Sequence, residues 1–497
     1  MRSIISSSFS KKVIIALLLI ATAKHSFSQI LDSSFGMNGI TNLPPNGNDL
    51  RPKSVVFQNN KILIGFYSVD ADNYQPEVDV YRLTKNGKID SSFGNYNGFT
   101  NFNFTTGGYI TLQKNNSILV AVSDTYNPQG YPIHVYRLLP NGKHDKSFGD
   151  NGMFIYKNNN FRNSITQISV RNDDKIIVAG FIYKRDSTHI SFFQLTKDGQ
   201  IDSTFGKKGF IYQTVSYEKT CVALKVLPGN KILCGFVYDS GKFNKTCLIR
   251  YTQRGKIDSS FGTNGIIVNN NNIKRITQYY MGLAITHDNK ILEFAADSNE
   301  QAILYRFTAN GKPDKSFGYK GNVIIPERED EEFSIAIDSA NRILVNDVKK
   351  NLPTIIRYTE DGKIDSAFGV NGSFSTGNVA HQVLMQSPNK FITTDWDIVA
   401  RYKYQGATAI SNYLSQPAKQ NSLVSVYPNP VTGIIHINAL NIHEETQVSV
   451  YDAAGKMVMF RVIKNTNELD VQQLPTGVYY LSISSGVQHA EIKFIKK

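Results

Sequence analysis

Cysteine is scarce in this sequence, with three residues in 497, so a disulfide framework cannot be what holds the fold. The spacing of Cys221, Cys234 and Cys247 matches no zinc motif. If Gly229-Asn230 is a two-residue turn, Lys225 faces Cys234, and Cys221 lies too far along its strand for a bridge. We expect small buried thiols, and a Cys234–Cys247 pair stays open.

Long hydrophobic runs are also missing. The only marked one, Val13–Ala21, follows Lys11-Lys12 and has about nine residues, too few to span a bilayer and typical of a signal-peptide core. Small residues follow it, so we predict that residues 1–28 are a signal peptide cleaved between Ser28 and Gln29. The mature chain is then expected to have no transmembrane segment, and no cysteine near the cut indicates a lipoprotein.

Acidic residues are fewer than basic ones, 41 against 54, for a net charge of +13. Loss of the signal peptide removes four basic residues and leaves +9. Such a surface is either merely solvated or attracts anionic polymers. Outside the cell these would be acidic polysaccharide or lipopolysaccharide, and we expect no nucleic acid partner.

The signatures of common enzymes are absent as well. The sequence has no HExxH pair, nucleophile elbow, P-loop or dinucleotide fingerprint. An acidic run at Pro326–Phe333 lacks the spacing of a known calcium loop, so a solvated loop is preferred over a calcium site. We therefore predict no catalytic residue, no cofactor and no metal site from motifs.

A six-residue motif of the form x-Asp-x-Ser-Phe-Gly is present seven times instead, with Thr or Ala once each in place of Ser. Its phenylalanines are 51 to 58 residues apart, which is long for a helical solenoid and suits one four-stranded propeller blade. The motif positions are Asp32, Phe35, Asp90, Phe93, Asp145, Phe148, Asp202, Phe205, Asp258, Phe261, Asp314, Phe317, Asp365 and Phe368.

Each repeat has the same order of predicted strands. A short strand follows the motif, then a second strand, a tight turn, a third strand and a fourth. Third strands such as Lys61–Phe66 are almost continuously apolar, as expected where both faces of a sheet are covered. The turns contain pairs such as Asn59-Asn60 and Asp173-Asp174, which predict two-residue hairpins, although Ala340-Asn341 and Pro388-Asn389 fit that turn less well.

The repetition of the motif suggests a structural role. Aspartate and serine can set a turn, and phenylalanine can anchor one blade against the next. An arginine precedes the motif aspartate by eight residues in most units, as Arg82 precedes Asp90, with Gln194 as the exception. Strict hairpin pairing of Asp90 with Leu83 would put Arg82 on the other face, so contact between Arg82 and Asp90 stays open.

The two ends of the repeat array are complementary. Asp32 has no fourth strand before it, and Arg401 has no motif after it. We expect Ile30–Phe35 to dock beside Val399–Tyr404, which closes a ring and removes an exposed sheet edge.

On these residues, the region of about 30–404 resembles the delta-60 repeat family of bacterial β-propellers. The resemblance implies an all-β fold with a seven-bladed β-propeller over residues 29–404. It implies no activity, because the family has no common reaction to carry over.

From Gln405 the repeats stop, and residues 405–422 are small and polar, typical of a linker. Alternation and regular glycines and prolines predict a small Ig-like β-sandwich over residues 423–497. This region resembles the sorting domain of type IX secretion substrates, through Pro428, Asn429, Pro430, Gly455, Gly477, Lys496 and Lys497. The resemblance implies transport through periplasm and outer membrane by the type IX machinery in a Bacteroidetes-type bacterium, often with cleavage in the linker. The alternative is a plain accessory domain.

Catalysis would require residues that differ between repeats. Glu293 replaces an apolar residue in a third strand, and Asp347, Asp395 and Asp397 interrupt the last two third strands. They could line a channel, or they are only polar residues near strand ends. The favoured interpretation is a secreted or surface-displayed propeller that binds a partner. A propeller hydrolase or lyase acting on carbohydrate is the alternative, and a structural adhesin component is a third possibility.

Overall fold

The computed structural model describes residues 31–44, 51–69, 76–104, 106–124, 131–157, 162–184, 187–215, 222–239, 244–273, 281–296, 302–325, 334–349, 352–369, 372–376, 382–403, 424–439, 446–452, 457–463, 466–485 and 488–497. The chain divides into two compact units. One is Ile30–Tyr404, and the other contains Gln405–Lys497. The signal-peptide region, the linker, the acidic run, Cys221 and Gly455 lie outside the described residues.

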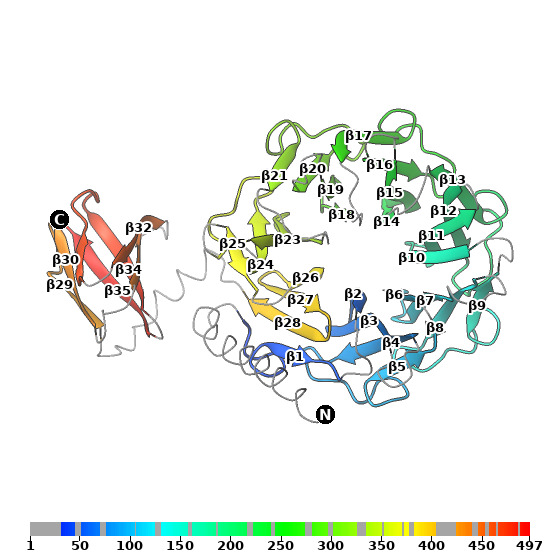
Figure 1. Ribbon diagram of the computed structural model, residues 1–497, viewed down its shortest axis with the longest axis horizontal. Helices are drawn as coiled ribbons and strands as arrows, with labels where there is room; N and C mark the ends of the chain where they lie inside the picture. Colours follow the sequence, from blue (N-terminus) through cyan, green and yellow to red (C-terminus); the bar gives the residue numbers. More distant parts are fainter. Residues whose placement is uncertain are drawn as a thin grey trace, which may run out of the picture. The chain divides into compact units, whose positions relative to one another are not determined.

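The described part of the first unit forms seven four-stranded antiparallel sheets. In each sheet the first strand faces the centre and the fourth lies at the rim (Figure 1). In chain order the sheets are β2 (Arg51–Gln58), β3 (Lys61–Val69), β4 (Pro76–Leu83), β5 (Phe99–Phe102); β6 (Thr106–Leu112), β7 (Ile118–Ser123), β8 (Ile133–Leu138), β9 (Met153–Tyr156); β10 (Arg162–Val170), β11 (Ile176–Lys184), β12 (Ser187–Leu195), β13 (Phe210–Val215); β14 (Val222–Leu227), β15 (Lys231–Asp239), β16 (Asn244–Tyr251), β17 (Ile266–Ile273); β18 (Gly282–Ile285), β19 (Ile291–Ala296), β20 (Ala302–Phe307), β21 (Asn322–Ile325); β22 (Ile335–Ile337), β23 (Ile343–Lys349), β24 (Leu352–Tyr358), β25 (Ser373–Ser375); and β26 (Gln382–Ser387), β27 (Lys390–Asp395), β28 (Ile398–Lys403), β1 (Ile40–Asn42).

The sheets follow one another in a circle. First strands contact those of both neighbouring sheets, and β26 of the last sheet contacts β2 of the first. Second strands are covered on both faces, as their sequence predicted. Ile62 and Ile64 pack in one core cluster while Leu63 packs in the next, and all three are fully buried. Alternate residues of one strand therefore fill two different sheet-to-sheet interfaces.

The ends of the ring are joined as predicted. The N-terminal strand β1 is the outer strand of the last sheet and pairs with β28 through Ile40 and Ala400. Asp32 donates its backbone N–H to the carbonyl of Arg401 (2.8 Å), and its carboxylate lies 2.9 Å from the Arg401 Nε. The start of the ring is thus held to its end by both backbone and charge.

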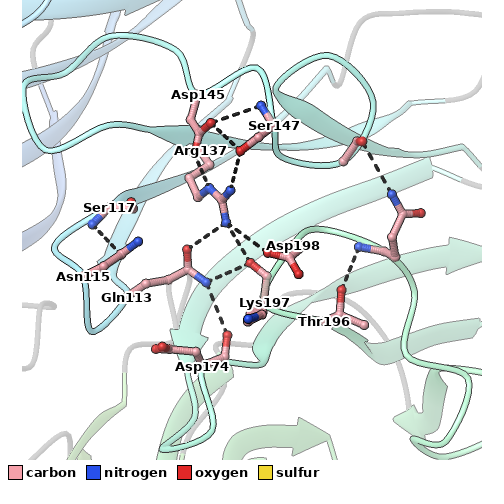
Figure 2. Close-up of polar contacts among 12 residues, drawn as sticks. Gln113, Asn115, Ser117, Arg137, Asp145, Ser147, Asp174, Thr196, Lys197 and Asp198 are labelled. Atoms are coloured by element: carbon pink, nitrogen blue, oxygen red, sulfur yellow. Dashed lines mark hydrogen bonds and ion pairs between the residues drawn. The ribbon is translucent and has the colours of Figure 1, made fainter.

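The motif connects neighbouring sheets (Figure 2). Arg137 Nε donates to Asp145 (2.8 Å), and its Nη2 donates to the hydroxyl of Ser147 (3.0 Å). Its Nη1 donates to the carbonyl of Lys197 (2.9 Å), in a turn of the following sheet. Phe148 is fully buried, with the guanidinium carbon 4.9 Å from its ring centroid. One arginine thus orders its own motif and holds the next sheet.

The contact that the sequence left open is therefore present. In the first sheet, Arg82 Nε donates to Asp90 (2.9 Å). Leu83 pairs with Ile89 rather than with Asp90, and the backbone N–H of Asp90 donates to the carbonyl of Arg82 (2.9 Å). This register brings the two side chains together. All seven motif phenylalanines are at most 1% exposed.

Five of the seven predicted two-residue turns are wrong. Only the turns at Asn59-Asn60 and Pro388-Asn389 have two residues between paired strand ends. Elsewhere three residues intervene, and Leu227 pairs with Lys231 across Pro228–Asn230. Leu224, not Lys225, therefore faces Cys234. An asparagine or aspartate with positive φ ends each longer turn, and that residue type alone does not distinguish the two lengths.

The motif carboxylates predict acid sensitivity. Burial alone would raise the pKa of Asp90, but hydrogen bonds from Lys61 and Ser92 and the charge of Arg82 lower it to about 2. A lowered folded-state pKa stabilises the fold above the ordinary pKa of 3.8, and this contribution is lost as the pH falls toward 2. We expect Asp90→Asn to be about 2 kcal/mol less stable than the parent at pH 7 and equally stable at pH 2, in denaturant titrations followed by circular dichroism.

Asp361, an exposed carboxylate outside the motif, offers the control. Asp361→Asn should change stability little at either pH, because exposed ion pairs contribute little. A constant difference between Asp90→Asn and the parent from pH 7 to pH 2 would contradict the assignment.

The second unit contains two sheets around a shared core. One has three strands, β29 (Val424–Tyr427), β30 (Ile434–Ala439) and β33 (Glu468–Asp470), and the other has four, β31 (Thr446–Asp452), β32 (Met457–Ile463), β34 (Gly477–Ser485) and β35 (Gln488–Lys496). Ile435 and Ile437 from the first sheet pack with Val448, Leu481 and Phe494 from the second, all nearly fully buried. The described tail is therefore a compact all-β unit.

Candidate functional site

The segment Pro428–Pro430 of the tail is held against the last strand of the chain. The side chain of Asn429 makes both contacts. Its Nδ2 donates to the carbonyl of Lys493 and its Oδ1 accepts the backbone N–H of Ile495, each at 2.9 Å. An asparagine side chain can pair in this way with a strand that has no further neighbour, because it supplies one donor and one acceptor.

The C-terminal residues extend this contact. Val431 donates its N–H to Ile495 and accepts the N–H of Lys497, both at 2.8 Å. Lys496 is 6% exposed and lies opposite Gly477 in the pairing of β34 with β35. Predicted sorting residues that are far apart in the sequence therefore meet at one end of the tail unit. The pattern of the sequence did not reveal the contacts of Asn429.

The surface near this end is partly apolar. Tyr427 is 53% exposed, and its ring stacks on His436 with centroids 5.3 Å apart. Ile495, next to Lys496, is 40% exposed. Exposed apolar side chains beside ordered polar backbone are the features of a surface that another protein recognises. We call Pro428–Val431 together with Ile495–Lys497 the terminal epitope.

Among the carboxylates considered for a channel, Glu293 is the most deeply placed. It lies on β19, the second strand of its sheet, and is fully buried. Asn269, on β17 of the preceding sheet, donates its Nδ2 to Glu293 Oε2 (2.6 Å). Burial raises the pKa of Glu293 to about 7, although hydrogen bonds with Thr246 and Asn269 act in the opposite direction. Its partners thus come from the adjoining sheet.

The other candidates lie on different sheets. Asp347 is on β23 and Asp395 at the end of β27, both at most 8% exposed, and Asp397 is in the turn after β27. Glu293, Asp347 and Asp395 thus occupy second strands of three successive sheets. In the described part of the chain, no group of three or more His, Cys, Asp or Glu side chains is arranged to hold a metal ion.

The partners of Glu293 were not recognised in the sequence. Thr246 and Asn269 face each other across β16 and β17, and the residues at the same places in the first sheet are the apolar pair Val78 and Phe102. The signal was present as a polar residue at three apolar repeat positions, but it is visible only after the sheets are aligned.

The cysteines are as favoured from the sequence. Cys234 and Cys247 are free thiols, at most 5% exposed. Burial, with a smaller effect of the Glu293 charge, raises the pKa of Cys247 to about 12, so this thiol stays protonated and unreactive near neutrality.

Two protein families match parts of the chain. The secretion system C-terminal sorting domain matches residues 425–497. A domain of unknown function described as a β-propeller (DUF5122) matches residues 58–93 and 171–205. The first match contains the described residues of the terminal epitope and the second lies in the ring of sheets. No curated protein is a significant match to the chain.

Solved structures with a similar arrangement include three β-rich proteins. The β-propeller domain of the Trilobed protease from Pyrococcus furiosus has 10% identity and a TM-score of 0.41, over 72% of this chain and 94% of that one. A PL25 ulvan lyase has 9% identity and a TM-score of 0.42, over 76% and 98%. The aldose sugar dehydrogenase from Streptomyces coelicolor has 9% identity and a TM-score of 0.37, over 60% and 93%. At these values the similarities say nothing of the activity of this chain.

Within the residues that the structure describes, no helix combines the length and the hydropathy required to cross a membrane.

Proposed function

We propose that this chain, a β-propeller protein with a C-terminal type IX secretion sorting domain, is a rigid binding scaffold presented outside the cell. The sorting domain places the protein at the cell surface or in the medium. In the proposal the seven sheets are the blades of a seven-bladed propeller, and the tail is an Ig-like sandwich. Residues 1–28 are removed between Ser28 and Gln29, and residues 405–422 are the linker.

The terminal epitope carries the export part of this proposal. Its residues include Pro428–Pro430 and Lys496-Lys497, which are ordered against each other although the sequence separates them by more than sixty residues. A folded epitope of this kind is available only after the tail has folded. The type IX machinery would then select chains whose tail is complete.

Binding is favoured over catalysis by the positions of the acidic side chains. A hydrolase or lyase requires its acid and base groups at one reacting bond. Glu293, Asp347 and Asp395 instead lie on three different sheets, and the partners of Glu293 come from the sheet next to it. A propeller enzyme acting on carbohydrate stays the alternative, with these residues and Asp397 as its candidates.

Export can be tested in a host that has the type IX machinery. We expect Asn429→Ala, and separately deletion of Lys496-Lys497, to lower the amount at the surface and in the medium about tenfold, because each removes about two backbone contacts of roughly 1 kcal/mol that order the epitope. Immunoblots of periplasm, intact cells and medium would measure the distribution, and mass spectrometry would locate the ends of the exported form.

Asn438→Ala is the matched control, since Asn438 is an exposed asparagine on β30 of the same unit. It should be exported like the parent. If Asn429→Ala, the Lys496-Lys497 deletion and a chain lacking residues 405–497 were all exported normally, the tail would not be the export signal.

A further inference from the structure

One edge of the ring carries a repeated lysine. A tight turn follows the third strand of six sheets, and its glycine is followed by an exposed lysine in five of them and by Gln200 in the sixth. We call this edge, defined by these turns, the lysine edge. Its repeated lysines are Lys88, Lys143, Lys256, Lys312 and Lys363.

The turns hold their lysines in fixed positions. In the first sheet, Thr84 donates its N–H to the carbonyl of Lys88 (2.8 Å) and accepts the N–H of Gly87 (2.9 Å). The Phe35 ring of the preceding motif fills the space at Gly87, where an added Cβ would lie 2.7 Å from ring carbons. Because each turn is packed on the neighbouring sheet, binding through its lysine orders little backbone.

Most of these charges are not neutralised. Within the described residues no acidic side chain pairs with Lys88, Lys143, Lys256 or Lys312, whereas Lys363 pairs with Asp361 (2.7 Å). The motif aspartates are occupied inside the ring, as Asp258 is by Arg250 and Lys231, both at 2.8 Å. A circle of uncompensated positive charges attracts a polyanion that reaches several of them at once.

An exposed aromatic side chain lies beside two of these turns. Tyr96 follows the first motif, is 59% exposed and stacks on Phe99 with centroids 5.3 Å apart. Gly94, two residues earlier, donates its N–H to Asn141 (2.8 Å), in the turn that ends at Lys143. Tyr319 occupies the corresponding place in another sheet and is 73% exposed. An aromatic face held next to lysines suits a ring-shaped ligand that carries negative charge.

We infer that the lysine edge binds an anionic polysaccharide, one bearing carboxylate or sulfate groups, with Lys88, Lys143 and Tyr96 forming one subsite. The lysines contact the acidic groups and the tyrosine packs on a sugar face. The exterior location makes a glycan the available polyanion, and the ring spacing suits a polymer better than a single sugar. This inference rests on the proposed binding function, but it is tested in solution and does not depend on export.

The purified full chain should bind heparin and polygalacturonate, with weaker binding as salt rises, and should not bind neutral dextran. Lys88→Gln with Lys143→Gln should weaken binding about tenfold, since two exposed charges each contribute on the order of 1 kcal/mol or less. Tyr96→Ala should weaken binding to polygalacturonate with its salt dependence unchanged. Isothermal titration calorimetry at three salt concentrations would measure each change.

The control pair is Lys157→Gln with Lys493→Gln, two exposed lysines outside the lysine edge, which alters net charge equally. It should bind like the parent. Equal losses in both pairs would mean that net charge alone attracts the polymer, and would overturn the inference. No binding of the parent to either acidic polymer, or tighter binding to single-stranded DNA that is unaffected by Tyr96→Ala, would also overturn it. Circular dichroism confirms that each variant is folded.

Discussion

Asp32→Ala is expected to lower the free energy of unfolding by about 3–5 kcal/mol, the largest effect of any single motif aspartate. Asp32 is 1% exposed and pairs with Lys390 and Arg401, each at 2.9 Å. Its loss leaves the buried guanidinium of Arg401 without its carboxylate partner. It also loosens the hold of the N-terminal strand on β28, the contact that joins the two ends of the ring.

Asp90→Ala is the matched comparison, because Asp90 has the same chemistry, pairing with Lys61 and Arg82, but its arginine is only eight residues away in the chain. Both variants lose a buried charge pair, whereas only Asp32→Ala affects ring closure. We therefore expect Asp32→Ala to be the less stable of the two and to expose β1 earlier in hydrogen exchange. Equal stability, with equal protection of β1, would mean that the closing pair contributes no more than a local one.

Gln194→Arg is expected to destabilise the protein by about 3–4 kcal/mol, although it restores the residue found at this position in every other unit. In the third sheet the guanidinium is supplied from elsewhere. Arg171 donates to Gln194 (2.5 Å) and to the carbonyl of Gln253 in the next sheet (2.7 Å), while Gln194 donates to Asp202 (2.6 Å). A second buried guanidinium would stand beside the first with one carboxylate between them.

The first sheet shows which second change should compensate. There Gln58 occupies the place of Arg171 and accepts a hydrogen bond from Arg82 (2.9 Å), so arginine and glutamine are exchanged between the two positions. Arg171→Gln added to Gln194→Arg should recover at least half of the lost stability, measured by denaturant titration of the two single variants and the double. Additive losses would show that the two positions do not act as a pair.

Much of the architecture could be predicted because it depends on local patterns. Seven motif copies at regular spacing, continuous apolar second strands in each sheet, and complementary chain ends all follow from residues near one another in the chain. Gln194 was visible as an exception, but its partner was not, since Arg171 lies 23 residues earlier. The turn lengths were misjudged because the same asparagines and aspartates suit two-residue and three-residue loops.

The candidate sites depended far more on packing. Glu293 stands out in its strand, yet its partners Thr246 and Asn269 belong to another sheet and became evident only when the sheets were in register. Asn429 and Lys496 were both singled out, but nothing in their neighbourhoods indicated that Asn429 pairs with the strand containing Lys496.

The amino-acid sequence was sufficient for the all-β fold, the joining of the chain ends and the sorting tail, because periodicity, turn residues and repeats act over short stretches of chain. The contact of Arg with Asp in each motif, the composition of the terminal epitope and the surroundings of each buried carboxylate were settled by the packed molecule. These features depend on strand register and on which distant segments lie side by side, and a one-residue change in register turns a side chain to the opposite face.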